Sequence, residues 1–482
     1  SFEPLTAGFA ARAQQLQFRT DDGLSWHSDA LALQMQGEGG AQHSRLQADR
    51  LDLALLARIA SRVPLAPAMR EALATYAPEG RVEQLQADWQ GPLDAIAAYS
   101  AKGRVAALSL AGGEEKVCAP TAFGLRNASG SFELTQAGGS AALSIQDGAL
   151  LLPGVFEDPC LPLQTLAANV RWQINGDGVS VESSDLRFAN ADAQGQARLR
   201  WRTGGSPEHL LPGVLDLSGS LTRANGTRVH RYLPLAVGTQ ARHYVRDAIT
   251  AGVSDEVKFR VRGDLKNLPF DNDPQGEFHI AARVKNTTYA YAPRSVLKPG
   301  DRPWPALTGL SGSLIFDRAS MRVEGAAGQV AGSPRLAVSQ VSARIPDLAT
   351  PVVQVTGDVA GPLGDMLAFV RGSQVSQLTQ GALDDMQAQG AASLRLQLHL
   401  PVAGLEQSRV QGSVLLAGNE VRVAPAAPRL TQAHGQVQFT ERGFELQQVR
   451  AQALGGEVRL SGGLKAPAQG GDAVLQVQAS GV

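Results

Sequence analysis

Few residues in this chain have the type and spacing that catalysis requires. The nearest match to a nucleophile elbow, Gly-x-Ser-x-Gly, is residues 309–313, which end on a serine where the last glycine should stand. The eight histidines are scattered, and His230 and His243 fit the spacing of neither a metalloprotease helix nor a zinc finger. We therefore expect a protein that is not an enzyme, with no catalytic residue, no metal and no cofactor.

Acidic residues do not form a catalytic arrangement either. Paired acids such as Asp384 and Asp385 are adjacent in sequence, and adjacent side chains point to different sides of a strand or helix. Residues 271–273, Asp-Asn-Asp, resemble the start of a calcium loop, but Pro274 follows and no glutamate closes the loop. A glycan-processing enzyme would need two carboxylates about 5–10 Å apart, and the sequence indicates no such pair.

Charge and composition exclude several other classes of protein. The 482 residues include 44 Lys and Arg and 45 Asp and Glu, for a formal net charge of −1. This balance is unlike that of nucleic-acid binders or polybasic membrane anchors. Hydrophobic residues make up 43% of the chain, which is enough for packed structure, and the 52 glycines indicate many turns. No apolar run approaches the roughly 20 residues of a membrane-spanning helix.

The dominant pattern is an alternation of apolar and polar residues with a period of two, which is typical of half-buried β-strands. Residues 394–400 read Leu-Arg-Leu-Gln-Leu-His-Leu, and residues 257–262 read Val-Lys-Phe-Arg-Val-Arg. The Asn-Gly-Asp-Gly at 175–178 predicts a hairpin. A small or polar pair around glycine recurs and is interpreted as a mark of strand starts, at 129–131, 218–220, 311–313, 411–413 and 461–463.

Helical periodicity is confined to four stretches, residues 51–63, 68–76, 241–249 and 363–370. Two of them lie in segments that resemble each other, because Gly80 and Gly252, and also Gly91 and Gly263, are separated by 172 residues. We expect a repeated β-rich module that carries a helical insert. The expected divisions are a β segment ending an upstream module at 1–50, helix plus β modules at 51–225 and 226–360, and a truncated module with a short helix at 361–482.

Alternation alone allows two architectures. In a closed β-sandwich one face of each strand packs in a core and the other faces water. In a long curved sheet the same apolar face would line an open groove, and large exposed apolar surfaces usually bind a ligand or partner. The two cysteines, Cys118 and Cys160, leave two alternatives as well: a disulfide in an oxidising compartment, or two unpaired thiols.

Several short motifs decide between the two architectures. They are Tyr-Leu-Pro at 232–234, Val-Arg-Gly-Asp-Leu at 261–265, Leu-Pro-Phe at 268–270, Leu-Ser-Gly-Ser-Leu at 310–314, Leu-Pro-Gly-Val-Phe-Glu at 152–157 and Gly-Pro-Leu-Gly-Asp-Met-Leu at 361–367. In this series the chain resembles the YhdP-type members of the AsmA-like family of Gram-negative bacteria. The resemblance spans most of the chain.

The resemblance implies a mostly β fold, with elongated, curved antiparallel sheets that form a repeating β-groove with a few short helical inserts. It also implies a periplasmic protein tethered to the inner membrane through a helix that this chain does not contain. Because the chain begins with Ser1, we expect any targeting segment upstream. The groove would carry phospholipid acyl chains between the inner and outer membranes and support outer-membrane integrity.

Alternation within this expected groove selects the candidate lipid-facing residues. They are Val257, Phe259, Val261, Phe278, Ile280, Leu314, Phe316, Leu394, Leu396, Leu398, Leu400, Val437 and Phe439. The alternative function is a non-catalytic envelope scaffold or assembly factor that binds protein partners through its β surfaces.

Overall fold

The structure is a computed structural model, and it describes residues 1–5, 7–19, 25–60, 65, 67–111, 118–205, 210–379, 381–404, 407–465 and 474–481. This described part of the chain is mostly β. In the described ranges the strands belong to one 25-stranded sheet. The strands are β1 (Phe2–Leu5), β2 (Gly8–Arg19), β3 (Ser25–Gln36), β4 (His43–Asp52), β5 (Glu79–Gln90), β6 (Ala98–Leu110), β7 (Gly124–Thr135), β8 (Gly138–Leu151), β9 (Cys160–Asn175), β10 (Gly178–Ala189), β11 (Ala193–Arg202), β12 (Val214–Asn225), β13 (Ile249–Asp264), β14 (Glu277–Tyr289), β15 (Leu307–Asp317), β16 (Ser320–Val330), β17 (Ser333–Ile345), β18 (Val352–Pro362), β19 (Gln387–Gln389), β20 (Ala391–Pro401), β21 (Arg409–Arg422), β22 (Leu430–Thr440), β23 (Gly443–Ala453), β24 (Gly456–Lys465) and β25 (Val474–Gly481).

Short helices interrupt the sheet at a few connections. They are α1 (Leu53–Ala60), α2 (Pro67–Tyr76), α3 (Thr239–Ala248), α4 (Leu363–Gly372) and α5 (Val375–Leu378), with the 3₁₀ helices η1 (Gly39–Ala41), η3 (Gly226–Tyr232), η4 (Leu265–Asn267) and η5 (Arg294–Val296). All four stretches with helical periodicity therefore contain a helix. Residues 61–63 of the first predicted stretch lie outside the described residues.

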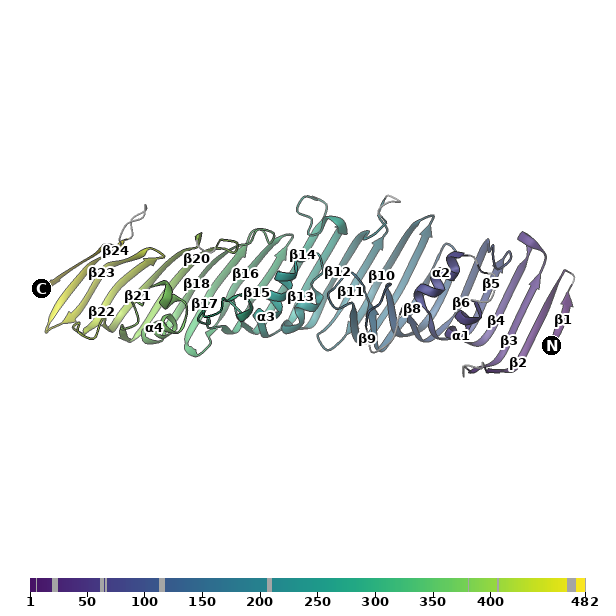
Figure 1. The fold of residues 1–482 in the computed structure, drawn as a ribbon, viewed down its shortest axis with the longest axis horizontal. Coiled ribbons are helices and arrows are strands. Elements are labelled where there is room, and N and C mark those ends of the chain that lie inside the picture. The colour runs from purple at the N-terminus through teal and green to yellow at the C-terminus, as the bar shows by residue number, and fades with distance from the viewer. Residues whose placement is uncertain are drawn as a thin grey trace.

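The sheet is an open antiparallel meander. Each strand pairs with the next along the chain, except that β19 pairs with the end of β21, and β18 pairs with β20. In the described part of the chain, β1 and β25 each have one neighbour, and no second sheet covers the first. Figure 1 shows the resulting long, curved ribbon of strands. The predicted elongated, mostly β fold is confirmed, and the closed sandwich is not formed. The expected module boundaries stay a prediction.

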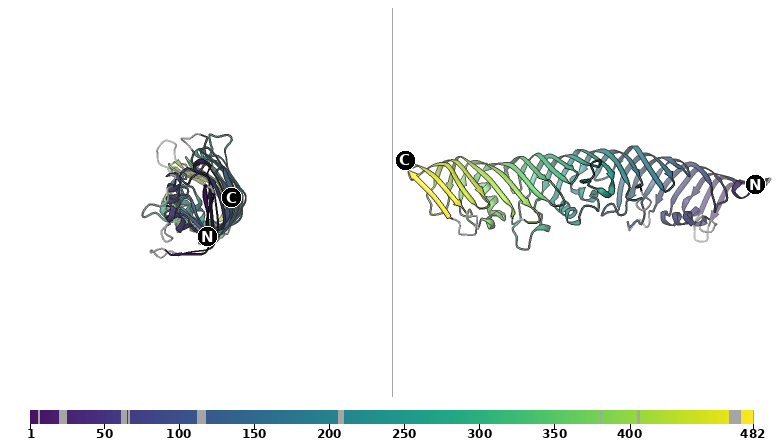
Figure 2. Two further views of the ribbon diagram at one scale, coloured as in Figure 1. Left: turned by 90° about the vertical axis from the view of Figure 1, so that its right-hand side faces the viewer. Right: turned by 90° about the horizontal axis from the view of Figure 1, so that it is seen from above.

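β-Bulges bend the strands across the ribbon. Residues with a left-handed backbone stand inside successive strands, for example Ala107 in β6, Asn127 in β7, Gln340 in β17 and Gln448 in β23. At each of these positions the pairing register shifts. A bulge adds one residue to one strand, bends it and increases its twist. Repetition of this device from strand to strand gives the sheet its cupped cross-section (Figure 2).

The described α-helices all lie at one edge of the sheet, which we call the helix edge. The connections from β4 to β5, from β12 to β13 and from β18 to β20 carry α1 and α2, η3 and α3, and α4 and α5, respectively. Because the strands are antiparallel, these connections leave and re-enter the sheet at the same edge. Figures 1 and 2 show the helices along one side of the ribbon. We call the opposite edge, where β9 turns into β10 at Asn175–Gly178, the turn edge.

The predicted role of the repeated glycine motif is wrong. Residues 218–220 and 411–413 lie inside β12 and β21, not at their starts. A Cβ atom at Gly219 would stand 2.5 Å from the Cζ atom of Phe259, and Gly412 is covered in the same way by the ring of Phe439. Each glycine therefore makes room for an aromatic ring from the neighbouring strand, which lies across the sheet.

Phe270 locks the connection between β13 and β14 at the turn edge. Its side chain is fully buried, and its ring packs beside Gly263 and Gly276. The Arg318 guanidinium donates hydrogen bonds to the carbonyl oxygens of Phe270 (3.1 Å) and Gly276 (2.9 Å). This contact ties the β13–β14 connection to the turn between β15 and β16.

We expect Phe270→Ala to lower the free energy of local unfolding by about 3–5 kcal/mol, because it deletes a buried aromatic ring. The elongated sheet should confine this loss to neighbouring strands. Hydrogen exchange of β13–β16 amides measures it, with β22 as internal reference. Phe123→Ala, which truncates a ring that is 51% exposed, is the matched control. Unchanged protection of β13 and β14 would contradict the prediction.

Candidate functional site

One face of the sheet is apolar and only half covered. In β20, Leu394, Leu396, Leu398 and Leu400 are half-buried, whereas the residues between them are exposed. Successive side chains of a strand point to opposite faces, so the four leucines share one face. We call this face, extended over all strands, the apolar face, and the opposite one the polar face.

Strand register aligns the apolar side chains into rows that run along the ribbon. One row crosses twelve strands, from β2 to β13, without a polar side chain, and Phe2 of β1 continues it. At about 4.8 Å between strands it extends for roughly 50 Å. Its members are Ala11, Leu33, Leu46, Ala87, Ala101, Leu134, Gly139, Trp172, Val181, Trp201, Leu215 and Gly263.

Similar rows continue to the other end of the sheet. One crosses fifteen strands from β6 to β21 and consists of Leu108, Ala128, Ile145, Leu166, Phe188, Gly195, Leu221, Val257, Ala282, Leu314, Val323, Ala343, Val355, Leu398 and Val410. A second consists of Phe259, Ile280, Phe316, Met321 and Ile345. A third consists of Val338, Val359, Leu394, Val414, Val437 and Leu446. The apolar surface is therefore continuous from strand to strand.

All thirteen residues selected from the sequence lie on this face. Val257 is buried and the other twelve are half-buried. Eight of them belong to the rows above. Of the rest, Val261 pairs with Phe278, Leu400 pairs with Val353, and Leu396 and Phe439 flank Gly412 from its two sides. Their contact with lipid stays a prediction.

Burial of the apolar face changes across the ribbon. Near the helix edge, Met366 of α4 packs with Val330, Leu336, Val338 and Ala392 in a buried cluster. In β20, Leu394 still packs against this cluster, whereas Leu396, Leu398 and Leu400, which lie closer to the turn edge, are half-buried and belong to no buried cluster among the described residues. The α-helices therefore cover the apolar face along the helix edge. The rest of this face is an open apolar groove.

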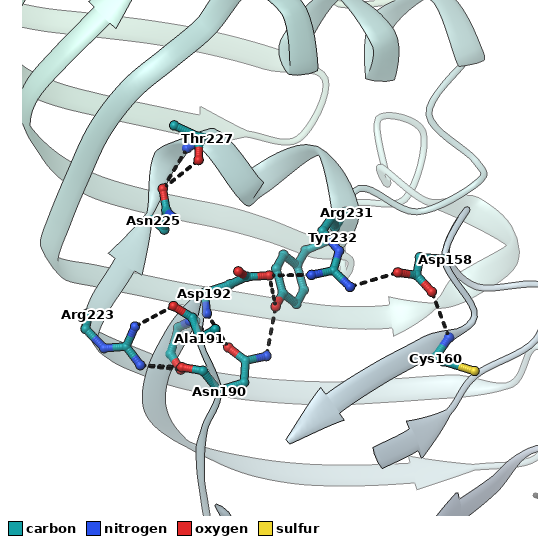
Figure 3. Close-up of polar contacts among 11 residues, drawn as sticks. Asp158, Cys160, Asn190, Ala191, Asp192, Arg223, Asn225, Thr227, Arg231 and Tyr232 are labelled. Atoms are coloured by element: carbon teal, nitrogen blue, oxygen red, sulfur yellow. Dashed lines mark hydrogen bonds and ion pairs between the residues drawn. The ribbon is translucent and has the colours of Figure 1, made fainter. Parts of the chain in front are cut away.

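A polar network fixes the helix edge where α3 is attached. Arg231 of η3 donates to Asp158 and to Asp192, with N–O distances of 2.8 Å in both ion pairs. The Tyr232 hydroxyl donates to Asp192 (3.1 Å) and accepts from Asn190 (2.9 Å). Figure 3 shows Arg231 between the two carboxylates, which come from the β8–β9 and β10–β11 connections. Three connections are thus joined at one point.

Two of these connections, β8–β9 and β12–β13, also meet through α3. The buried side chain of Arg242 forms an ion pair with Glu157 (3.2 Å), which also lies 3.4 Å from His243. Hydrogen bonds from these two residues lower the pKa of the Glu157 carboxyl. The Tyr244 and Tyr289 hydroxyls lie 2.8 Å apart, and this contact links α3 to β14. These contacts hold α3 at the helix edge.

Cys118 and Cys160 form a disulfide in the structure, with Cα atoms 6.2 Å apart. It ties the β6–β7 connection to the first residue of β9. The backbone amide of Cys160 also donates to Asp158, so the disulfide lies next to the network around Arg231. The sequence left its formation open because cysteine spacing alone does not give distance.

The residues selected from the sequence do not include the groove residues of the N-terminal half. The candidates begin at Val257, although the row from Ala11 to Gly263 lies on β2 to β13 and the row through Val257 itself begins at Leu108 in β6. Small side chains such as Ala87 and Ala101 occupy many positions of this row, which weakens the contrast between alternate residues. The aromatic residues Trp172 and Trp201 were the available signal, since both lie in alternating segments.

In the described ranges, no three His, Cys, Asp or Glu side chains gather where they could hold a metal ion. Among the described helices, none is both long and apolar enough to cross a membrane.

An open curved sheet with an apolar face and helices along one edge defines an elongated β-groove protein. The sequence comparison agrees with this class: the family model described as YhdP protein matches residues 1–482. The chain belongs to the YhdP family.

A curated relative is the "Intermembrane phospholipid transporter YhdP" of Escherichia coli (strain K12). It is 24% identical over 432 residues, which cover 87% of this chain and 32% of the relative. The chain therefore spans about a third of the relative's length. The relative is a transporter and not an enzyme. No solved structure matches the chain.

Proposed function

We propose that this chain forms part of a periplasmic bridge whose groove carries phospholipids, by their acyl chains, between the inner and outer membranes. The observation that carries the proposal is the set of apolar rows that follow the ribbon while remaining half-open. A transport path needs both features, since a sealed core cannot load and a polar surface cannot hold an acyl chain. The transporter name of the Escherichia coli relative supports the same activity.

The energetics suit movement along the groove. Each buried CH₂ group contributes about 0.8 kcal/mol, so an acyl chain gains its affinity from many small contacts. No charged side chain interrupts the row from Ala11 to Gly263. A chain that slides by one strand therefore exchanges one set of apolar contacts for a similar one. The polar headgroup remains in water beside the open side of the groove.

The proposed location is the periplasm, with a tether to the inner membrane through a segment that is not in this chain. The disulfide between Cys118 and Cys160 supports an oxidising compartment. The proposed consequence of lipid supply is maintenance of the outer membrane.

Mass spectrometry of organic extracts tests the lipid cargo. The protein is purified from bacterial periplasm without detergent, beside a soluble β protein of similar size as control. We expect phospholipid to copurify at a reproducible molar ratio and to be absent from the control. Equal lipid in both samples would overturn the proposal and leave the scaffold function as the better reading.

A further inference from the structure

The polar face carries an unusual row of basic residues. Register places Arg322 opposite Arg344, Arg344 opposite Gln354, Gln354 opposite His399, and His399 opposite Arg409. The row thus crosses five consecutive strands of the sheet, β16, β17, β18, β20 and β21. Like charges directly opposite each other destabilise a sheet, so this arrangement requires a reason.

Another part of the same face shows the ordinary arrangement. Between β9 and β14 one row alternates in charge and consists of Arg171, Glu182, Arg200, Asp216, Arg262 and Glu277. Arg200 forms an ion pair with Glu182 at 3.4 Å. Each basic residue of this row faces acids on the neighbouring strands, so its charge is balanced within the sheet.

The basic row is not balanced in this way. Glu324 reaches Arg322 only at 3.9 Å, and Glu441 lies near Arg409 but also pairs with Arg442 at 3.6 Å. In the residues that the structure describes, Arg344, the second residue of the row, has neither an ion pair nor a hydrogen bond from its side chain. The Nε atom of Arg322 is shielded from water and also lacks a hydrogen-bond partner.

The row lines a depression of about 690 Å³ in the polar face. Besides Glu324 at one end, its other polar lining is made of the neutral hydrogen-bonding side chains Ser342, Thr356, Gln397 and Gln411. They form a second row that runs beside the basic one. Guanidinium groups match carboxylates in geometry, and amide and hydroxyl side chains match a peptide backbone.

We propose that this depression binds an acidic segment of a protein partner in extended conformation. Four strand spacings of about 4.8 Å give the basic row a length of roughly 19 Å. An extended segment of about six residues spans the same length. The row follows the long axis of the ribbon and lies in a hollow, so a linear chain fits it better than the plane of a membrane surface. This proposal does not depend on lipid carriage.

A fluorescein-labelled peptide of six Glu-Thr repeats provides the probe, with six Lys-Thr repeats as control peptide. We expect the acidic peptide to bind, with affinity falling as salt rises, and the basic peptide not to bind. Fluorescence anisotropy gives the dissociation constants. Failure of the acidic peptide to bind the wild-type protein would overturn the proposal.

Arg344→Glu is the decisive variant, and Arg200→Glu is its control with the same change in net charge. We expect Arg344→Glu to weaken peptide binding at least tenfold and Arg200→Glu to change it less than twofold. Arg344→Glu should unfold at no lower temperature than wild type, because it replaces a like-charge contact with Arg322 by an attractive one. Equal losses in both variants would refute the site.

Vesicles containing anionic phospholipid test the other kind of partner. Flotation of wild-type protein with such vesicles, lost in Arg344→Glu, would overturn the peptide proposal in favour of a membrane contact. Absence of flotation alongside peptide binding would support it.

Discussion

Leu396→Glu is expected to remove at least nine-tenths of the phospholipid that copurifies with the protein, while the fold survives. Leu396 is half-buried on the apolar face of β20, between Gly357 on one neighbouring strand and Gly412 on the other. In the empty groove a carboxylate there reaches water, so folding loses little. Under an acyl chain it would be desolvated, which costs several kcal/mol for an ionised group without a partner. Since 1.4 kcal/mol corresponds to a tenfold change in affinity, loss of lipid follows.

Gln397→Glu is the matched control for this variant. The residue is the next one in the same strand, is exposed, and lies on the polar face. Gln397→Glu adds the same charge at a neighbouring position of the same strand. Because the new carboxylate lies on the polar face, the lipid content should not change. Circular dichroism and thermal unfolding establish that both variants are folded. If Leu396→Glu fails to fold, Phe259→Glu in β13 provides the second test, and a folded variant with normal lipid content at either position would contradict an acyl-chain groove.

The sequence predicted the strands far better than it predicted which strands share a surface. Alternation in residues 394–400 matches β20 because this strand has no bulge. In β6, by contrast, the left-handed Ala107 stands between Val105 and Leu108. Because a bulge inserts one residue, the apolar side changes phase there and strict alternation is lost. A pattern of period two therefore identifies a strand, but beyond a bulge it no longer shows on which face of the sheet each side chain lies.

The periodicity of the sequence also could not predict whether the sheet is open or packs into a closed sandwich. A sandwich and an open groove have the same alternation, and the family resemblance was needed to choose between them. The difference lies in what packs against the apolar face. Only short stretches of helix are available, such as α4 with Met366 and Leu367 buried, and they cover one edge alone. The low helical content was readable from the sequence, but the placement of the described α-helices at one edge follows from antiparallel strand order.

The network around Arg231 was not predictable, because its partners are far apart in sequence. Asp158 and Asp192 precede Arg231 by 73 and 39 residues. The strands from β8 to β13 must pair before the three connections that carry these residues meet at the helix edge. No local pattern marks such residues, and Arg231 has the same appearance in the sequence as the exposed arginines of the strands.

Arg231→Met is expected to destabilise the helix edge by about 3–5 kcal/mol, the usual cost of removing one partner from a buried ion pair. The side chain of Asp192 is only 9% exposed, so its carboxylate would retain the Tyr232 hydroxyl but no cation. Hydrogen exchange of η3, α3 and the β10–β11 connection should report the loss. Arg200→Met, which removes an exposed ion pair with Glu182, should cost less than about 1 kcal/mol.

A double-mutant cycle separates the charge from the packing of the arginine. Asp192→Asn removes the buried carboxylate, so Arg231→Met with Asp192→Asn should cost much less than the sum of the two single changes. Additive losses would show that Arg231 acts through packing alone. The distinction bears on the groove, since η3 leads directly into α3 beside the apolar face. If the ion pairs hold α3 in place, Arg231→Met should loosen this edge, and the double variant should restore both hydrogen-exchange protection and lipid content.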